Sequence, residues 1–174
     1  MKPMEKPALL HTPQLTLHAM SEGDEAAMAA LLTNEEIART YMIPVFDSPA
    51  AVKALFERIR QLTLAPDKVV YGIYRGQTLV GFANEVHREG ETMELGYVIH
   101  PEHKNRGYAT EALKALISAV FSLGFSTVVA GAFEENAASL RVMEKCAMTP
   151  TGETEEIAYR GKTHRCIFCK ISKE

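Results

Sequence analysis

The chain has 174 residues, 47% of them apolar, and its 22 acidic and 19 basic side chains give a net charge of -3. This is the length of one domain, here residues 1–174 with 1–9 flexible, and the charge excludes a basic surface for duplex nucleic acid. No segment has the about 20 consecutive apolar residues of a membrane helix, and no signal peptide core follows residues 1–6, so we expect a cytoplasmic protein.

The first third of the chain predicts one strand followed by three helices. Apolar side chains alternate along the strand, and each helix begins at a polar residue that can cap its first turn. The elements are a strand over residues 15–19 and helices that begin at Ser21, Asn34 and Ser48. The third helix carries an apolar stripe on one face and ends before Pro66.

The remaining segments predict more strands with helices between them. Turn residues separate three apolar runs that are typical of an antiparallel meander, over 68–74, 78–87 and 93–100. A helix then runs from Gly107 to a natural stop at Gly124, with its apolar residues on one face. The chain ends with a buried strand over 125–133, a helix over 136–145 and a hairpin that turns at 160–162.

Two of the three cysteines form a C-x-x-C pattern after a histidine, at Cys166, Cys169 and His164. A zinc site needs further ligands at a workable spacing, and the remaining cysteine, Cys146, lies in a different helical segment. We therefore interpret 165–171 as a final strand that contains small apolar cysteines, without a metal.

A short basic turn between the strand over 93–100 and the next helix has the form of an anion site. Its sequence is Lys104-Asn-Arg-Gly-Tyr-Ala109, with the small residues Gly107 and Ala109 at the start of the helix. Backbone N–H groups of such a turn point at one spot, where the helix dipole adds positive charge. The usual nucleotide motifs are absent, so the alternatives are a phosphate site of another kind and an ordinary loop with a capping glycine.

This turn resembles the Gln/Arg-x-x-Gly-x-Gly/Ala segment of the GCN5-related N-acetyltransferases (GNAT), with Lys104 where Gln or Arg is usual. The predicted order of elements resembles that family's fold over nearly the whole chain. Stretches at 10–17, 95–101, 107–112 and 136–145 resemble its RimJ/RimL-like branch, which acetylates the N-termini of ribosomal proteins. The resemblance implies an α/β (α+β) fold with a mixed central sheet of about seven strands and helices on both faces.

The resemblance also implies direct transfer of acetyl from acetyl-CoA, a co-substrate, to an amine. It implies that the strand over 93–100 is bulged and splays from the next one, leaving a free backbone N–H near Tyr97 or Val98 that polarises the thioester. The cofactor-binding residues that it implies are Val98, Ile99, His100, Lys104, Asn105, Arg106, Gly107, Tyr108, Ala109, Thr110, Asn136 and Ser139.

Two side chains are candidates for proton transfer. The resemblance gives Ser139 the task of donating to the leaving sulfur, while the alternative for Asn136 and Ser139 is a helix cap and a solvated helix residue. Glu94 begins the strand beside the expected cleft and is the first candidate base, with a merely solvated carboxylate as the alternative. The other candidate bases are Glu85, Glu134 and Glu135.

The expected acceptor is a primary amine, either a protein or peptide N-terminus, such as that of a ribosomal protein, or a small molecule. It should meet the segment 35–49 and the final hairpin, where an apolar cluster over 41–46 is either core packing or a substrate wall. A non-catalytic acyl-CoA-binding regulatory module is the alternative function. The sequence leaves the acceptor's identity open, as well as the choice between a monomer and a homodimer.

Overall fold

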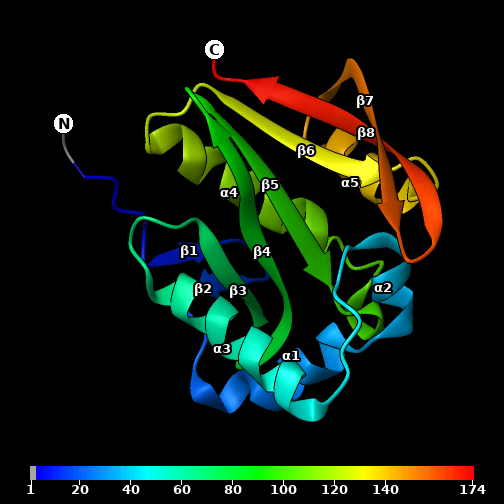
Figure 1. Ribbon diagram of the computed structural model, residues 1–174. Coiled ribbons are helices and arrows are strands. Elements are labelled where there is room, and N and C mark those ends of the chain that lie inside the picture. The colour runs from blue at the N-terminus through cyan, green and yellow to red at the C-terminus, as the bar shows by residue number, and fades with distance from the viewer. Residues whose placement is uncertain (1–2) are drawn as a thin grey trace.

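The computed structural model describes residues 3–174 as an eight-stranded mixed sheet with helices on both of its faces (Figure 1). The strands are β1 (Leu9–His11), β2 (Thr16–His18), β3 (Val70–Arg75), β4 (Thr78–Glu89), β5 (Thr92–Ile99), β6 (Thr127–Phe133), β7 (Thr149–Tyr159) and β8 (Lys162–Ser172). The α-helices are α1 (Glu25–Leu32), α2 (Glu35–Thr40), α3 (Pro49–Leu64), α4 (Tyr108–Ser122) and α5 (Ala137–Lys145). The order across the sheet is β1-β2-β3-β4-β5-β6-β8-β7, with all neighbours antiparallel except β5 and β6. The predicted fold class is confirmed.

The caps predicted from the sequence are present at the first three helical segments. The Asn34 and Ser48 side chains each accept a hydrogen bond from a backbone N–H in the first turn of α2 and of α3. Ser21 and Asp24 form a capping box, although its first turn is a short 3-10 helix that leads into α1. These boundaries are predictable because each cap is satisfied within three residues of the chain.

The N-terminal segment differs from the prediction. β1 pairs with β2 and forms an eighth strand that sequence alternation does not reveal, because three residues are too few for a pattern. The flexible segment expected over 1–9 includes residues 1–2, which lie outside the described residues. Lys6 is buried, and its ammonium group donates to the carbonyls of Thr63 and Val70, each at 2.8 Å, so the chain is tied to α3 and β3 here.

Two apolar clusters fill the space between the sheet and its helices. α4 and α5 cover one face, where Leu113, Leu116 and Val120 of α4 are almost completely buried. α1 and α3 cover the other face, where Phe56 of α3 is completely buried. The apolar stripes that the sequence predicts for α3 and α4 are therefore the surfaces that pack on the sheet.

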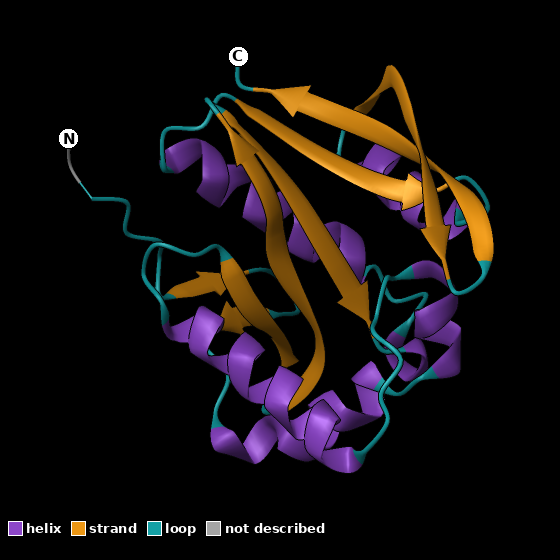
Figure 2. Cartoon of the chain, viewed as in Figure 1, coloured by secondary structure: helices purple, strands orange, loops and turns teal. Residues whose placement is uncertain are grey.

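β5 and β6 separate partway along their length, and Figure 2 shows them diverging toward one end. Their parallel pairing ends at Leu95 and Ala130, whereas β5 stays paired with β4 as far as Ile99. The N–H of His100 donates to a carbonyl of β4, and backbone groups alternate in direction along a strand. The backbone groups of Tyr97 and Ile99 therefore face the gap without a strand partner.

The bulge expected in β5 lies in β4 instead. The register between the two strands shifts between Glu85 and His87, so Val86 is the extra residue. β5 has no room for an extra residue here, because its other edge is paired with β6 in continuous register from Thr92 to Leu95. The splay of β5 from β6 is thus produced without a bulge in β5.

Candidate active site

A cavity of about 630 Å³ occupies the gap between the diverging ends of β5 and β6. We call it the cleft, and its walls come from β5, the turn after β5, the start of α4, the end of β6, α2 and α5. Three stretches that are far apart in the sequence, 36–41, 96–110 and 131–145, thus meet around one space. The residues predicted for cofactor binding that line it are Val98, Ile99, Lys104, Asn105, Gly107, Tyr108, Ala109, Thr110, Asn136 and Ser139.

The turn before α4 uses two left-handed backbone conformations. Asn105 has a φ of 62° and Gly107 a φ of 80°, values that asparagine tolerates and glycine adopts without strain. No protein atom lies within 4 Å of the position of a Cβ on Gly107, so the backbone conformation requires glycine and protein crowding does not. No side chain from residues 3–174 caps this start of α4. The N–H groups of its first turn therefore remain for an anion.

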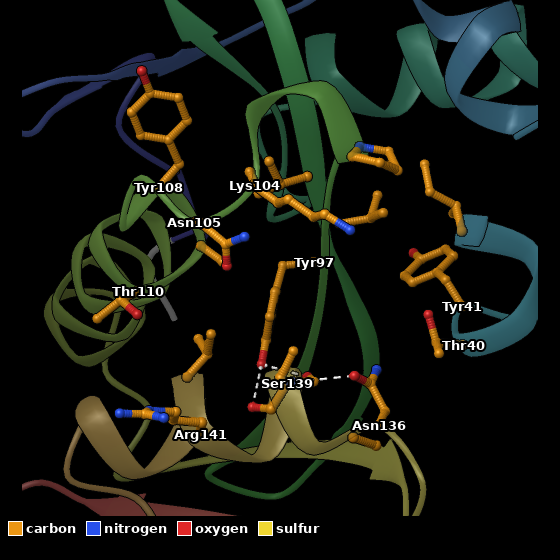
Figure 3. Close-up of a pocket in the computed structure, with 18 of the residues that line it drawn as sticks. Thr40, Tyr41, Tyr97, Lys104, Asn105, Tyr108, Thr110, Asn136, Ser139 and Arg141 are labelled. Atoms are coloured by element: carbon orange, nitrogen blue, oxygen red, sulfur yellow. Dashed lines mark hydrogen bonds between the residues drawn. The ribbon is translucent and has the colours of Figure 1, made fainter.

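Contacts with the core and with the N-terminal region hold the start of α4. Tyr108 is buried, and Figure 3 shows its ring directed away from the cleft, so only its backbone faces the opening. The Glu111 carboxylate accepts hydrogen bonds from the Gln14 N–H at 2.6 Å, from the Gln14 side-chain amide at 2.9 Å and from the Thr12 hydroxyl. These contacts fix the direction in which the first turn of α4 presents its N–H groups.

Positive side chains gather around the cleft. Lys104 lines it from the turn, and Arg141 and Lys145 line it from α5. The Lys104 ammonium lies 2.6 Å from a carboxylate oxygen of Glu36 on α2, and this hydrogen bond holds the pKa of Glu36 below its ordinary value. His103 Nδ1 is buried without a hydrogen-bond partner in the described part of the chain. A lining with these cations fits an anionic ligand.

Two hydroxyl groups meet in the cleft (Figure 3). Tyr97 Oη lies 2.8 Å from Ser139 Oγ and 3.3 Å from the Ser139 carbonyl oxygen. The Asn136 side-chain oxygen accepts from the Ser139 N–H at 3.1 Å, so Asn136 caps α5 while it also lines the cleft. Burial raises the pKa of Tyr97 to about 12, which keeps the phenol neutral near pH 7. The pair can pass a proton between its two oxygens.

Tyr97, Arg141 and Lys145 are among the side chains of this site that the sequence does not predict. The signal for Tyr97 is its place in a buried strand, because a buried tyrosine hydroxyl needs a hydrogen-bond partner. Arg141 and Lys145 are four residues apart, and that spacing puts two cations on one face of a helix. Neither of these sequence features shows that the three side chains line the same cleft.

Of the residues predicted for catalysis or cofactor binding, Glu94, His100 and Arg106 do not line the cleft, and neither do the alternative bases Glu85, Glu134 and Glu135. Glu94 is half-buried on the part of β5 still paired with β6, and burial raises the pKa of its carboxyl, against the charge of His87 and with that of Glu155. His100 Nδ1 accepts a hydrogen bond from a backbone N–H two residues ahead and begins a short 3-10 helix. The Arg106 side chain is exposed.

Two of the other candidate bases are held by neighbouring side chains, Glu85 in an ion pair and Glu135 in a hydrogen bond. Glu85 accepts a hydrogen bond from the Val69 N–H at 2.9 Å and pairs with Arg88 at 2.5 Å. Glu135 pairs with the buried ring of His164. Glu94 and Glu134 have no ion-pair partner within 4.0 Å among residues 3–174, so these two carboxylates are not held by a cation.

The described residues were compared with the requirements of a metal site and of a membrane-crossing helix. No three His, Cys, Asp or Glu side chains in residues 3–174 are grouped so that they could hold a metal ion. None of the helices in that range combines the length and the apolar character that a membrane crossing needs. Cys166 and Cys169 are free, buried thiols in β8, which confirms the interpretation of this segment as a strand.

Residues 14–149 match the acetyltransferase (GNAT) domain family. The chain is also 28% identical over 161 residues to the uncharacterized N-acetyltransferase YoaA of Bacillus subtilis, an alignment that covers 89% of this chain and 90% of YoaA.

Two solved structures share the fold. The ribosomal L7/L12 α-N-protein acetyltransferase RimL, in complex with coenzyme A, has a TM-score of 0.82 and 17% identity, over 94% of this chain and 97% of RimL. Spermidine N-acetyltransferase from Vibrio cholerae, in complex with CoA and spermine, has a TM-score of 0.77 and 20% identity, over 91% of this chain and 95% of that one. At these identities the likeness establishes the fold alone.

Proposed function

The chain belongs to the acetyltransferase (GNAT) domain family, and on that premise we propose that it transfers acetyl from acetyl-CoA directly to a primary amine. The observation that carries the proposal is the cleft, which brings an uncapped helix start and a hydroxyl pair to the two sides of one opening. Its volume of about 630 Å³ lies within the range usual for ligand sites.

In the proposed complex, backbone groups make most of the hydrogen bonds to acetyl-CoA. The N–H groups of the first turn of α4 bind the diphosphate, with Lys104, Arg141 and Lys145 supplying positive charge beside it. The Tyr97 carbonyl and the backbone groups of Ile99, which face the gap, bind the pantetheine amides as a neighbouring strand would. Bound acetyl-CoA supplies an acetyl group activated as a thioester.

The two proton transfers fall to side chains on either side of the sheet. Ser139 donates a proton to the leaving sulfur, Tyr97 passes its own proton to Ser139 through the 2.8 Å contact, and the Tyr97 phenolate then regains a proton from water. The N–H of Tyr97 donates to the thioester carbonyl oxygen as negative charge develops on it. Glu94 accepts the proton that the amine loses, directly or through one water, and burial raises the pKa of its carboxyl, which makes the carboxylate a stronger base.

The proposed acceptor is a peptide N-terminus or a small-molecule amine. Solved proteins with this fold include one named for a protein N-terminus and one named for spermidine, so the scaffold accommodates both kinds. The RimJ/RimL-like assignment is part of the proposal and is supported by the segments at 95–101 and 136–145.

The test is a screen of amines and N-terminal peptides with acetyl-CoA, read by coenzyme A release and by mass spectrometry of the acetylated product. We expect release with one class of amine, and a higher unfolding temperature in the presence of acetyl-CoA. The absence of any thermal protection by acetyl-CoA would contradict the proposal. Tight binding of acetyl-CoA without product from a broad screen would instead favour the non-catalytic acyl-CoA-binding module.

A further inference from the structure

A second cavity, of about 350 Å³, lies on the face of the sheet that α1 and α3 cover. Its volume falls within the range of ligand sites. Its lining is mainly apolar and consists of Leu32, Tyr41, Met42, Ile43, Pro44, Leu55, Ile59, Leu62, Lys68, Val70, Phe82, Asn84 and Glu85.

Tyr41 separates this second cavity from the cleft, because its side chain lines both. Its hydroxyl donates to Asn84 Oδ1 at 2.6 Å, and its ring packs edge-on against Phe82 with the centroids 5.7 Å apart. Gly96 lines the cleft on the other side, where an added Cβ would lie 3.3 Å from Asn84 Oδ1 and 3.8 Å from Tyr41 Cε2. The two cavities therefore adjoin at Tyr41, which lines both, with Gly96 on the cleft side and Asn84 on the side of the second cavity.

The charges at the second cavity compensate each other. Lys68 and Glu85 form an ion pair at 3.7 Å, and Glu85 also pairs with Arg88. The remaining lining offers no further charged group, so a charged occupant would lose its hydration without gaining a partner. Met42, which is 54% exposed, is a flexible apolar side chain at this lining.

From this geometry we infer that the second cavity binds an uncharged apolar group carried by the acceptor amine. The inference rests on the proposed function: the amine nitrogen lies in the cleft near Gly96 and its apolar substituent passes Tyr41. Because the two cavities adjoin at Tyr41, the reacting nitrogen of the acceptor lies on the cleft side and its apolar group lies beyond Asn84. Acceptors with such a group are therefore preferred over short or fully polar amines.

The test compares ethylamine, butylamine and hexylamine as acceptors, with the rate of coenzyme A release giving kcat/KM. Each additional methylene buried in the cavity is expected to raise kcat/KM by about fourfold. Leu55→Phe and Ile59→Phe place extra volume in the cavity from α3 and are each expected to lower kcat/KM for hexylamine at least tenfold, with ethylamine unchanged. Leu64→Phe, at an exposed position of the same helix that does not line the cavity, is the matched control.

A second readout separates this inference from the proposed function. Titration calorimetry of hexylamine into protein saturated with coenzyme A measures occupancy of the cavity without turnover, and circular dichroism establishes that each variant is folded. Hexylamine binding that both filling variants weaken supports the inference even if no amine is acetylated. Equal kcat/KM for the three amines, or hexylamine binding that is absent or unchanged in the folded variants, overturns it while acetylation of any amine leaves the proposed function intact.

Discussion

The hydroxyl oxygens of Tyr97 and Ser139 lie 2.8 Å apart and join β5 to α5 across the gap between β5 and β6. Burial raises the pKa of Tyr97 to about 12, so the phenol keeps its proton at any ordinary assay pH. A serine alone is a weak acid, but a serine hydrogen-bonded to a protonated phenol can give up its proton and receive another. The contact is thus the part of the site on which the proposed chemistry depends most.

Ser139→Ala should lower kcat by about 100-fold, the lower end of what a positioned acid contributes, while the Kd of acetyl-CoA changes by less than about twofold. Tyr97→Phe should lower kcat by about tenfold, because Ser139 keeps its contact with the leaving group but loses its proton source. Steady-state coenzyme A release gives kcat, and titration calorimetry gives the Kd.

Tyr71→Phe is the control for the tyrosine variant. The Tyr71 hydroxyl donates to the Pro7 carbonyl at 2.6 Å and does not line the cleft, so its loss removes a buried hydrogen bond without touching the site. Its kcat should equal that of the unaltered protein. An unchanged kcat in Ser139→Ala would remove Ser139 from the role of proton donor.

Gly107→Ala tests the turn at the start of α4. A φ of 80° is a left-handed conformation, so alanine should lower the free energy of unfolding by about 1 kcal/mol. The new methyl group also projects into open space next to the N–H groups proposed to bind the diphosphate, and loss of one such charge-assisted bond should raise the Kd of acetyl-CoA by about tenfold.

Gly76→Ala is matched to this change. Gly76 lies between β3 and β4 with a φ of 59°, and no protein atom lies within 4 Å of its added Cβ. It should lose similar stability in urea unfolding and bind acetyl-CoA normally. Equal Kd values for the two variants would mean that the turn at Gly107 does not bind the diphosphate.

Glu36→Gln tests the ion pair between α2 and the turn. In the structure the Lys104 ammonium lies 2.6 Å from a carboxylate oxygen of Glu36. A neutral glutamine should free this ammonium for the diphosphate and remove a negative charge beside the cleft. We expect the Kd of acetyl-CoA to fall about threefold at low salt, and the gain to shrink at 0.5 M NaCl because salt screens exposed charges. Glu156→Gln, in an exposed pair with Arg165 on the hairpin, should leave the Kd unchanged. A higher Kd in Glu36→Gln would show that Glu36 helps to position Lys104 for binding.

The turn before α4 is predictable from the sequence because its constraint is local. Asn105 and Gly107 have positive φ, and the helix that follows them starts without a side-chain cap. Both features involve consecutive residues, and positive φ favours asparagine and glycine directly. The same holds for the helix caps at Asn34 and Ser48.

The hydroxyl pair and the second cavity are not predictable in this way. Tyr97 meets Ser139 only because β6 diverges from β5 after Leu95, and nothing in the sequence of either strand gives the point of divergence. Glu94 illustrates the same limit: it is three residues from Tyr97 on a strand, so alternation sends the two side chains to opposite faces of the sheet. Its nearness to the cleft in sequence therefore does not make it a lining residue.

Lys6→Met tests the anchor of the N-terminal segment. The ammonium group donates to two carbonyls at 2.8 Å and lies 4.8 Å from the centroid of the Tyr71 ring, so its removal leaves the carbonyls of Thr63 and Val70 without these donors. We expect a loss of about 1–3 kcal/mol in the free energy of unfolding at pH 7, measured by urea titration. Lys53→Met, at an exposed lysine of α3 paired with Glu25 at 3.7 Å, should change stability by less than about 0.5 kcal/mol.

Lys6→Met and Lys53→Met also test how the free energy of unfolding depends on pH, and the direction of the change can be predicted. Burial lowers the pKa of Lys6 from 10.5 to about 8, so between these values the folded protein has lost a proton that the unfolded chain still binds. Stability rises with pH when the unfolded state binds more protons. The free energy of unfolding of the unaltered protein, minus that of Lys6→Met, should therefore increase by about 1 kcal/mol per pH unit above pH 8. Tyrosine ionisation is common to both proteins and largely cancels in this difference. A difference that stays flat from pH 7 to 9.5, as expected for Lys53→Met, would mean that the Lys6 ammonium is hydrated and the N-terminal segment is not anchored in solution.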